Sequence, residues 1–513
     1  MSEALWDVPS SWAWVRICDV GQVVAGGTPS TKEPKFWGQD VVWFSPADLT
    51  GYSAKLIRRG AKGLSALGLR NSSARVMPAG SVMFSSRAPI GYVAINATDA
   101  ATNQGFKSVV PSPAVFSDFL YYYLKASKQL AEERATGTTF KEISGSAFSV
   151  LPVPLPPLSE QHRIVAKIEA LFSELDKAVE SLTLAWAQLK TYRQALLKHA
   201  FEGKLTADWR AANADRLETP EALLSRIRKE REARYARAFD AWQTALAEWR
   251  AGGEVGRKPG RPSVLRDFGN DLKDIEIILP DLPSGWAWGR LGLASFRPEY
   301  GTSAKSAKDG EVPVIRMGNL QNGLIDWNDL VYTSDADEIE KYQLESNDIL
   351  FNRTNSPELV GKTAIYKGER PALFAGYLVR VNQIDTIVLP QYLCYFLNSH
   401  IARAHGNTVK TDGVNQSNIN GSKLQDYPFP FCCLDEQAEI VSLLDERLSV
   451  IDAALADVEV HTAKANALRQ SILKQAFSGQ LVAQDPADEP ASALLARLRG
   501  TAPVPKTRRK KTE

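Results

Sequence analysis

Two long stretches of the chain carry hydrophobic residues at the seven-residue spacing of a coiled coil. The first stretch begins at Leu158, and its apolar positions are Ile168, Leu175, Leu182, Leu189 and Leu196, with Phe172, Val179 and Trp186 four positions after the first three. This spacing predicts one long helix with a single apolar seam. Four prolines between 152 and 157 precede it, Ser159 suits its N-cap, and Gly203 suits its end.

The second stretch repeats this pattern more loosely. Its apolar positions are Leu444, Ile451, Val458, Ala465 and Ile472, which predicts another long helix from about 435 to 477. A third, highly charged helix is expected from Pro220 to Arg250, where the plainest role of the arginines is a solvated face. A flexible linker over 251–262, a short helix near 493–499 and a basic tail over 506–511 complete this part of the prediction.

The two remaining regions, 1–157 and 265–433, have a different pattern. They are rich in glycine, proline and aromatic residues, and they contain short β-branched runs such as 41–44 and 312–316. Such runs between turn residues predict mixed α+β domains. Within the first region, Tyr121, Tyr122 and Tyr123 are predicted to belong to a packed helix rather than to a surface that stacks on bases.

The chain contains an internal repeat with a period of about 275 residues. Pro-Ser-x-Trp-Ala-Trp occurs at 9–14 and at 283–288, and Leu-x-Glu-Gln occurs at 158–161 and at 434–437. The segment 193–201 returns as 469–477. Between these anchors the two copies differ. Repeated anchor motifs around divergent regions are expected of a duplicated recognition protein whose two copies have different specificities. Drift after duplication would give the same pattern.

Composition limits the possible functions. The 513 residues are 44% hydrophobic and 23% charged, and 61 basic residues against 59 acidic ones give a net charge of +2. Any surface for nucleic acid must therefore be local. There is neither an apolar run long enough for a membrane span nor a secretory signal, so we expect a cytoplasmic protein without membrane contact. The four cysteines lack metal-ligand spacing and are expected to be reduced, structural thiols.

Motifs for catalysis are missing from the sequence. It has no Gly-x-x-x-x-Gly-Lys-Ser/Thr phosphate loop, and it has no Asn- or Asp-Pro-Pro-aromatic motif of the kind that holds a flipped base. The segment 355–358 lacks the second proline and the aromatic residue, so we expect a turn there. The five histidines show no metal spacing. Any chemistry is therefore expected in partner subunits, and this chain is expected to bind no cofactor or metal.

The ordered set of motifs, given twice, resembles the specificity subunits of type I restriction-modification systems. The set is a Pro-Ser-x-Trp opening, a divergent region, a proline-rich run into Leu-x-Glu-Gln, and a long helix that ends in Ala-Phe-x-Gly-x-Leu. The resemblance implies an α+β fold in which two α/β target recognition domains are separated by two long helices. These helices would form an antiparallel coiled coil within an internal pseudo-two-fold repeat.

The resemblance also gives expected boundaries along the chain. The first recognition domain would span 1–157, the first spacer helix 158–212, and the extra charged helix with its linker 213–264. The second recognition domain would span 265–433, the second spacer helix 434–482, and the short helix with the basic tail 483–513. Segments 26–32 and 102–106 look like elements of a common family variant, whereas 300–303 and 374–377 depart from it in the second domain.

The function implied by this resemblance is DNA recognition without catalysis. Each domain would bind one half of a bipartite target on double-stranded DNA, and the helices would set the spacing and dock two methyltransferase subunits. These partners would methylate adenine, and restriction or translocase subunits would add cleavage. S-adenosylmethionine, ATP and Mg²⁺ are expected in the partner subunits.

Polar loop clusters are the candidate DNA contacts, because phosphates and base edges are bound by cationic, amide and hydroxyl groups. Arg87 and Arg353 each follow an apolar run and are expected at strand ends. For any single member, turn capping or solvation is at least as good an explanation. The candidates are Thr28, Ser30, Lys32, Ser85, Ser86, Arg87, Asn103, Gln104, Thr138, Thr139, Lys141, Ser303, Lys305, Arg316, Asn319, Asn352, Arg353, Asn355, Lys410, Thr411, Asn415, Gln416 and Asn418.

Three other functions compete with this prediction. A fused methyltransferase-nuclease would carry its own reader, but the missing motifs oppose it. A coiled-coil adaptor would use the two divergent regions to bind proteins. A modification-only methyltransferase would use the same chain as its reader half. Binding to a library of random duplexes would separate the DNA reader from the adaptor.

Overall fold

The computed structural model describes residues 6–500 apart from 88, 138–140, 257, 270 and 415. The chain divides into two compact units that do not follow the sequence repeats. The first unit combines the chain up to Leu184 with the chain from Val458 onward, and the second unit is Ala185–Asp457. Each long helix is therefore shared between both units.

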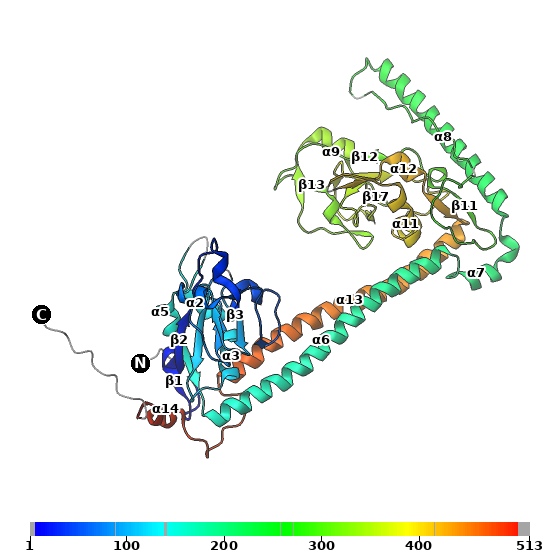
Figure 1. Ribbon diagram of the computed structural model, residues 1–513. Coiled ribbons are helices and arrows are strands. Elements are labelled where there is room, and N and C mark those ends of the chain that lie inside the picture. The colour runs from blue at the N-terminus through cyan, green and yellow to red at the C-terminus, as the bar shows by residue number, and fades with distance from the viewer. Residues whose placement is uncertain are drawn as a thin grey trace. The chain divides into compact units, whose positions relative to one another are not determined.

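The two long helices are α6 (Leu158–Phe201) and α13 (Leu434–Phe477), each of 44 residues, and they run side by side (Figure 1). Arg469 forms an ion pair with Asp176 in the first unit, and Arg193 forms one with Asp452 in the second. A step of 17 residues forward on α6 is thus matched by 17 residues backward on α13. The predicted antiparallel pair is confirmed.

The burial of the apolar seam changes along α6. Ile168 and Leu196, near its two ends, are buried by the globular regions, whereas the seam residue Leu182 is half-buried. A two-helix seam covers its residues from one side only, so this gradient is expected. The predicted N-cap was wrong by two residues, because α6 already begins at Leu158 and Ser159 lies in its first turn. Gly203 ends the helix with a φ of 68°, as predicted.

The globular part of the first unit is mixed α+β, as predicted. A five-stranded sheet has the order β2-β9-β6-β7-β4, and a three-stranded sheet has the order β5-β3-β8. The strands are β1 (Ala13–Arg16), β2 (Gly21–Ala25), β3 (Trp37–Phe44), β4 (Leu56–Ile57), β5 (Gly63–Leu64), β6 (Val82–Phe84), β7 (Val93–Asn96), β8 (Ala100–Thr102), β9 (Lys107–Pro111) and β10 (Pro152–Leu155). The helices are α1 (Ile17–Val20), α2 (Ala66–Arg70), α3 (Ser117–Ala126), α4 (Lys128–Glu133) and α5 (Gly145–Ser149).

The three tyrosines of α3 are buried in the core of the first unit, which confirms the prediction of a packed helix.

The globular part of the second unit is also mixed α+β, but its strands are more numerous and shorter. Its main sheet has the order β12-β21-β17-β19-β15-β14, beside three-stranded sheets of order β16-β13-β20 and β18-β23-β22. The strands are β11 (Ala287–Arg290), β12 (Glu299–Tyr300), β13 (Val312–Ile315), β14 (Leu320–Gln321), β15 (Leu324–Ile325), β16 (Val331–Thr333), β17 (Ile349–Asn352), β18 (Thr354–Asn355), β19 (Thr363–Ile365), β20 (Leu373–Phe374), β21 (Leu378–Val381), β22 (Thr411–Asp412), β23 (Ser417–Asn418) and β24 (Pro428–Phe431). The helices are α7 (Ala207–Ala212), α8 (Pro220–Ala251), α9 (Ala336–Tyr342), α10 (Pro390–Leu397), α11 (His400–Val409) and α12 (Gly421–Gln425).

A two-stranded antiparallel sheet closes each globular region where it joins its long helix. In the first region β1 pairs with β10, so that Trp14 faces Pro154. In the second region β11 pairs with β24, so that Trp288 faces Pro430. The prolines next to each long helix therefore belong to a strand that brings the two ends of the region together.

The repeated Glu-Gln pair at each helix start is a structural clasp. Glu436 is fully buried, accepts a 2.8 Å hydrogen bond from the indole of Trp286, and forms an ion pair with Arg210. Gln437 donates to the carbonyl of Cys432 and accepts from the backbone N–H of Leu389. Each buried polar group thus has partners, as burial requires. The pair ties the helix to the globular region.

The first copy of the clasp repeats this arrangement with one substitution. The indole of Trp12 donates a 3.0 Å hydrogen bond to Glu160, and Gln161 bonds to the backbone at Ala114 and Phe116. Here Gln484, rather than an arginine, completes the carboxylate. The repeated sequence motifs are therefore explained by packing.

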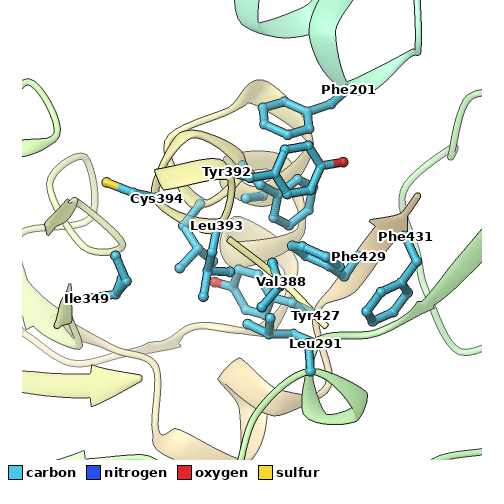
Figure 2. Close-up of a cluster of buried hydrophobic side chains, with 14 of the residues drawn as sticks. Phe201, Leu291, Ile349, Val388, Tyr392, Leu393, Cys394, Tyr427, Phe429 and Phe431 are labelled. Atoms are coloured by element: carbon cyan, nitrogen blue, oxygen red, sulfur yellow. The ribbon is translucent and has the colours of Figure 1, made fainter. Parts of the chain in front are cut away.

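Each globular region also packs on the last turn of the long helix from the other repeat. Phe201 at the end of α6 contacts Tyr392 and Phe396, with ring centroids 5.2 and 5.3 Å apart, in the core drawn in Figure 2. Phe477 at the end of α13 contacts Phe119 and Tyr123 of the first region at 5.5 and 5.2 Å. The two repeats have thus exchanged their helix ends.

The charged helix α8 has the expected extent, and the segment after it is held in place. The indole of Trp242 donates a 3.1 Å hydrogen bond to the carbonyl of Pro259, and the guanidinium of Arg261 lies 5.5 Å from the ring centre of Phe239. The segment expected to be a flexible linker thus folds back on α8. The short C-terminal helix is α14 (Ala491–Gly500), and the basic tail over 506–511 lies outside the described residues.

A buried histidine makes the second unit sensitive to acid. His405 is 2% exposed, and neither of its ring nitrogens has a hydrogen-bond partner within the described chain. Burial, with a further contribution from Arg290, lowers its pKa to about 4. The unfolded chain, with a pKa of about 6.5, binds the proton more readily than the folded one, so stability falls as pH drops below about 6.5.

We expect His405→Phe to remove much of this acid sensitivity. Between pH 7.5 and 5.0 the wild-type second unit should lose about 2 kcal/mol more of its free energy of unfolding than the variant, from about 1.4 kcal/mol per pKa unit. Urea unfolding read by amide hydrogen exchange of 400–431 measures this difference. The exposed His199→Gln serves as control and should behave as wild type; equal pH slopes for wild type and His405→Phe would contradict the prediction.

Candidate nucleic-acid interface

An open polar cleft of about 970 Å³ lies in the second globular region. Its walls come from the segment after β12, the β13 and β17 strand ends, the β20–β21 turn and β23. Five of the predicted contacts line it, namely Ser303, Arg316, Asn319, Arg353 and Asn418. The structure thus brings together residues more than 100 positions apart in the sequence.

Arg353 follows the buried strand β17, as predicted, and its side chain is held in a fixed orientation. Its guanidinium lies 4.8 Å from the ring centre of Tyr300, and Nη1 donates a 3.3 Å hydrogen bond to the carbonyl of Gly376. Its Nε has no partner among the described residues. Stacking on one face and one backbone bond orient the planar fork while leaving donors for a ligand.

Arg316 is the second cation of the cleft. Its Nη2 donates to the carbonyl of Asp329 at 2.6 Å and pairs with the exposed carboxylate of that residue at 3.3 Å. Asn418 on β23 donates a 2.7 Å hydrogen bond to Thr354 on the neighbouring strand β18. Guanidinium and amide groups of this kind are the ones that read base edges.

Two predicted contacts of the second region are buried and serve the scaffold. Asn319 is 4% exposed, and its amide bonds to the carbonyls of Asp326 and Asn328. Asn352 is fully buried within β17. Asn319 holds the loop that lines the cleft and Asn352 lies within the sheet, so their burial does not fit a direct contact with DNA.

The remaining candidates of this region lie at its surface in various roles. Ser303, Lys305 and Gln416 are exposed. Lys410 bonds to the carbonyl of Pro357, and Thr411 accepts from Lys423. Asn355 accepts from the next backbone N–H, which caps the turn that follows, and Asn415 lies outside the described residues.

In the first region, Arg87 also follows a buried strand, but it is paired. Its guanidinium lies 3.4 Å from Glu142, which also accepts from Lys107 at the same distance. Lys107, 8% exposed, donates in addition to Ser86 at 3.2 Å. This network fixes the loop. The side chain of Arg87 is 40% exposed.

A hydrogen bond joins two loops of the first region that carry other candidates. Thr28 donates to Gln104, and Asn103 accepts from the N–H of Gly105 at 2.8 Å. Ser30, Lys32 and Lys141 are exposed. Thr138 and Thr139 lie outside the described residues.

Ser85 and Ser86 do not fit the predicted role. Both are fully buried. The hydroxyl of Ser85 donates to the carbonyl of Pro89 at 2.7 Å and accepts from the N–H of Tyr92 at 2.8 Å. Hydroxyl groups that are buried and bonded in this way hold a turn and cannot reach a base edge.

Two tyrosines, one in the cleft and one that stacks on a cleft residue, were not predicted as contacts. Tyr377 lines the cleft and is 50% exposed, and Tyr300, which stacks on Arg353, is 39% exposed. Both lie in the segments 300–303 and 374–377, where the second region departs from the pattern of the first. That departure was the signal in the sequence by which the two tyrosines could have been found.

The described residues show neither a metal centre nor a membrane-spanning helix. No group of three or more His, Cys, Asp or Glu side chains there is placed to hold a metal ion. None of the described helices is long and apolar enough to cross a membrane. All four cysteines are free, and Cys18 is exposed, so it is not the structural thiol that was expected.

Comparison with known proteins assigns the family. The profile of the type I restriction modification DNA specificity domain matches residues 9–182 and 297–454, which is more than half of the chain and one match in each repeat. The EcoKI specificity subunit of Escherichia coli is 26% identical over 404 residues, 76% of this chain and 72% of that protein.

A second relative matches a shorter part more closely. The MjaIX specificity subunit of Methanocaldococcus jannaschii is 37% identical over 170 residues, and this match spans 33% of this chain and 39% of that protein. Among solved structures, a chain from a study of complex assembly and conformational transition of the type I R-M system has a TM-score of 0.62. It is 20% identical, and the match covers 93% of this chain and all of that one, which supports the fold.

The relatives carry the name of specificity subunits, the non-catalytic members of their systems, and the two profile matches fall on the two copies of the repeat. The fold agrees, with two mixed α+β regions and two antiparallel helices. The chain therefore belongs to the family of type I restriction-modification DNA specificity subunits, with a target recognition domain in each repeat.

Proposed function

We propose that the two recognition domains each bind one half of a bipartite DNA target. The observation that carries this proposal is the polar cleft of the second region, where Arg353 and Arg316 present guanidinium groups beside Asn418. A planar guanidinium pairs with guanine and an amide pairs with adenine in the major groove. The first region would use the loops of Thr28, Gln104 and Arg87 for the other half.

The long helices would set the distance between the two half-sites. At about 1.5 Å per residue, 44 residues span about 66 Å, which is close to two turns of DNA. The half-buried middle of the seam, around Leu182, leaves the flanks of the pair free for other subunits. We expect two methyltransferase subunits to dock there.

Catalysis would reside in these partners. S-adenosylmethionine would be bound by the methyltransferase subunits that modify adenine, and ATP with Mg²⁺ by restriction or translocase subunits. The chain itself would act as the reader in the cytoplasm, where such a complex meets DNA. Because the net charge of this chain is only +2, the partner subunits would add cations that bind the DNA phosphates.

The proposal is tested on the complex of this chain with its methyltransferase subunits. Methylation of a library of random duplexes should be confined to one bipartite sequence. We expect Arg353→Gln to relax selection at one base pair of the half-site read by the second domain. Loss of a bidentate pair costs about 1–3 kcal/mol, or roughly 5- to 150-fold in discrimination.

Arg370→Gln is the matched control, because Arg370 also stacks on an aromatic ring, that of Trp327, but does not line the cleft. It should leave the target unchanged. Selection that is identical in all three proteins would remove Arg353 from the interface. A complex that assembles but selects no sequence would instead favour the protein-binding adaptor.

A further inference from the structure

A second cavity, of about 300 Å³, lies in the second unit between the end of α6 and the recognition domain. Its walls come from α6, the β14–β15 turn, the start of β19, α10 and α11. Four cationic side chains line it, namely Lys190, Arg193, Lys362 and Arg403. No carboxylate is among its lining residues.

The positive charges of this cavity are only partly neutralised. Arg193 is paired with Asp452 and donates to the carbonyl of Asn322 at 3.4 Å. Lys362 donates to the neutral amide of Gln321 at 3.2 Å. In the described chain, Lys190, Lys362 and Arg403 have no carboxylate within ion-pair distance, and Lys190 lies instead over the ring of Trp186. Among the described residues, Lys362 and Arg403 therefore have neither a counter-charge nor a ring to stack on.

The two unpaired cations also repel each other. The pKa of Lys362 is lowered, first by burial and then by the charge of Arg403. Lys362 is half-buried and Arg403 is exposed, and holding these like charges together is unfavourable unless an anion joins them. A phosphate would supply both the charge and several acceptor oxygens for Lys and Arg donors.

The equivalent cavity of the first unit provides a built-in comparison. Arg469 occupies the place of Arg193, and the cavity measures about 880 Å³. Carboxylates line this one beside its lysines, among them Glu169, Asp176 and Glu180. The unbalanced positive charge is thus a property of the second unit and does not follow from the shared framework.

The position of Lys362 connects the cavity with the reading cleft. The backbone N–H of Asn352 donates to the carbonyl of Lys362 at 2.8 Å, so Lys362 sits across from the end of β17. Arg353, the next residue after β17, lines the cleft. Arg353 of the cleft and Lys362 of the cavity therefore flank one pair of strands, β17 and β19, which lie about 4.8 Å apart.

We propose that this cavity binds a phosphate group, and that in the working complex this group belongs to the backbone of the DNA read by the neighbouring cleft. The inference rests on the proposed function for the source of the phosphate, but not for the site itself. Lys362 and Arg403 are the cations that hold it. The first unit has no equivalent contact at its cavity, where three carboxylates offset most of the charge of four cations.

The test compares Lys362→Gln/Arg403→Gln with Lys125→Gln/Lys177→Gln, which removes two lysines from the first unit's cavity. DNA binding by the complex is measured against salt concentration. A lost phosphate contact reduces the logarithmic salt slope by about 0.9, so the affinity lost between 50 and 200 mM salt becomes roughly three- to fourfold smaller. We expect this only for the Lys362 and Arg403 variant.

A second measurement uses the lone full chain and inorganic phosphate against chloride at equal ionic strength. Phosphate should slow amide hydrogen exchange over 359–365 and 399–406 in wild type but not in the double variant. Protection by phosphate with an unchanged DNA slope would assign the site to a free anion and overturn the DNA source. No effect in either measurement would overturn the site. A complex that selects no DNA sequence would refute the proposed function, while the phosphate measurement would still decide the site.

Discussion

Replacing residues 1–157 with the matching region of another family member should change one half of the DNA target completely and leave the other half intact. The region is closed by its own strands, because β1 and β10 pair at its two ends. A transplanted region therefore brings with it the strand pair that closes its two ends. Mapping methylated bases in cells that carry the chimaera with its methyltransferase subunits measures the outcome.

The structure also specifies what the transplanted region must fit. It has to accept Glu160 through a tryptophan in the position of Trp12, and it has to cover Phe477 as Phe119 and Tyr123 do. The donor should therefore carry a tryptophan and an aromatic helix at these places. A donor region without them is the matched control, and it should give an unstable complex rather than a new target.

The reciprocal exchange of 265–433 should change the other half-site. Each exchange replaces specificity that is worth several kcal/mol, since every mismatched base pair costs about 1–3 kcal/mol. Loss of both half-sites in a chimaera that still assembles with its partners would show that the domains do not read independently.

Lengthening the helix pair should move the two half-sites apart without changing either one. One heptad adds about 10.5 Å to a helix, or about three base pairs, but three base pairs also rotate one half-site far around the DNA axis. Three heptads add about 32 Å, close to one full DNA turn. We therefore expect three heptads inserted after Leu182 and after Val458 to give a target with a spacer about nine to ten base pairs longer.

Whole heptads keep the apolar seam and both ion pairs between the helices, because Asp176–Arg469 and Arg193–Asp452 lie outside the two insertions. Three heptads in α6 alone would separate the pairs, and this control should lose methylation altogether. The original target should lose its methylation in the double-insertion variant. An active double-insertion variant that keeps the original spacer would show that the helices do not set the distance.

The long-range plan of the fold could be predicted from the sequence because it rests on periodic patterns. The heptads around Leu182 predict the first long helix, and the repeat of Glu160 as Glu436 marks the start of the second. The charged run after Pro220 predicts α8 with the right extent. These signals depend on local spacing, which survives without knowledge of tertiary contacts.

The exchange of helix ends could not be predicted, since nothing local marks Phe201 as a partner of Tyr392 rather than of its own repeat. The site was harder still. Ser85 and Asn352 have the chemistry of DNA contacts, but the fold buries them, while Tyr377 became a cleft residue through a turn that no periodicity indicates. Whether a polar side chain can contact DNA depends on its burial, and burial is set by the tertiary structure.

The exchanged helix ends have a consequence for the order in which the protein can fold during synthesis. The core of the first unit includes Ile472, Phe477 and Leu494, which leave the ribosome after the whole of the second unit. Ala185–Asp457 can therefore complete its core first, although it starts later in the chain. The N-terminal domain must wait with part of its apolar surface uncovered, so it is the part of the nascent protein most in need of chaperones.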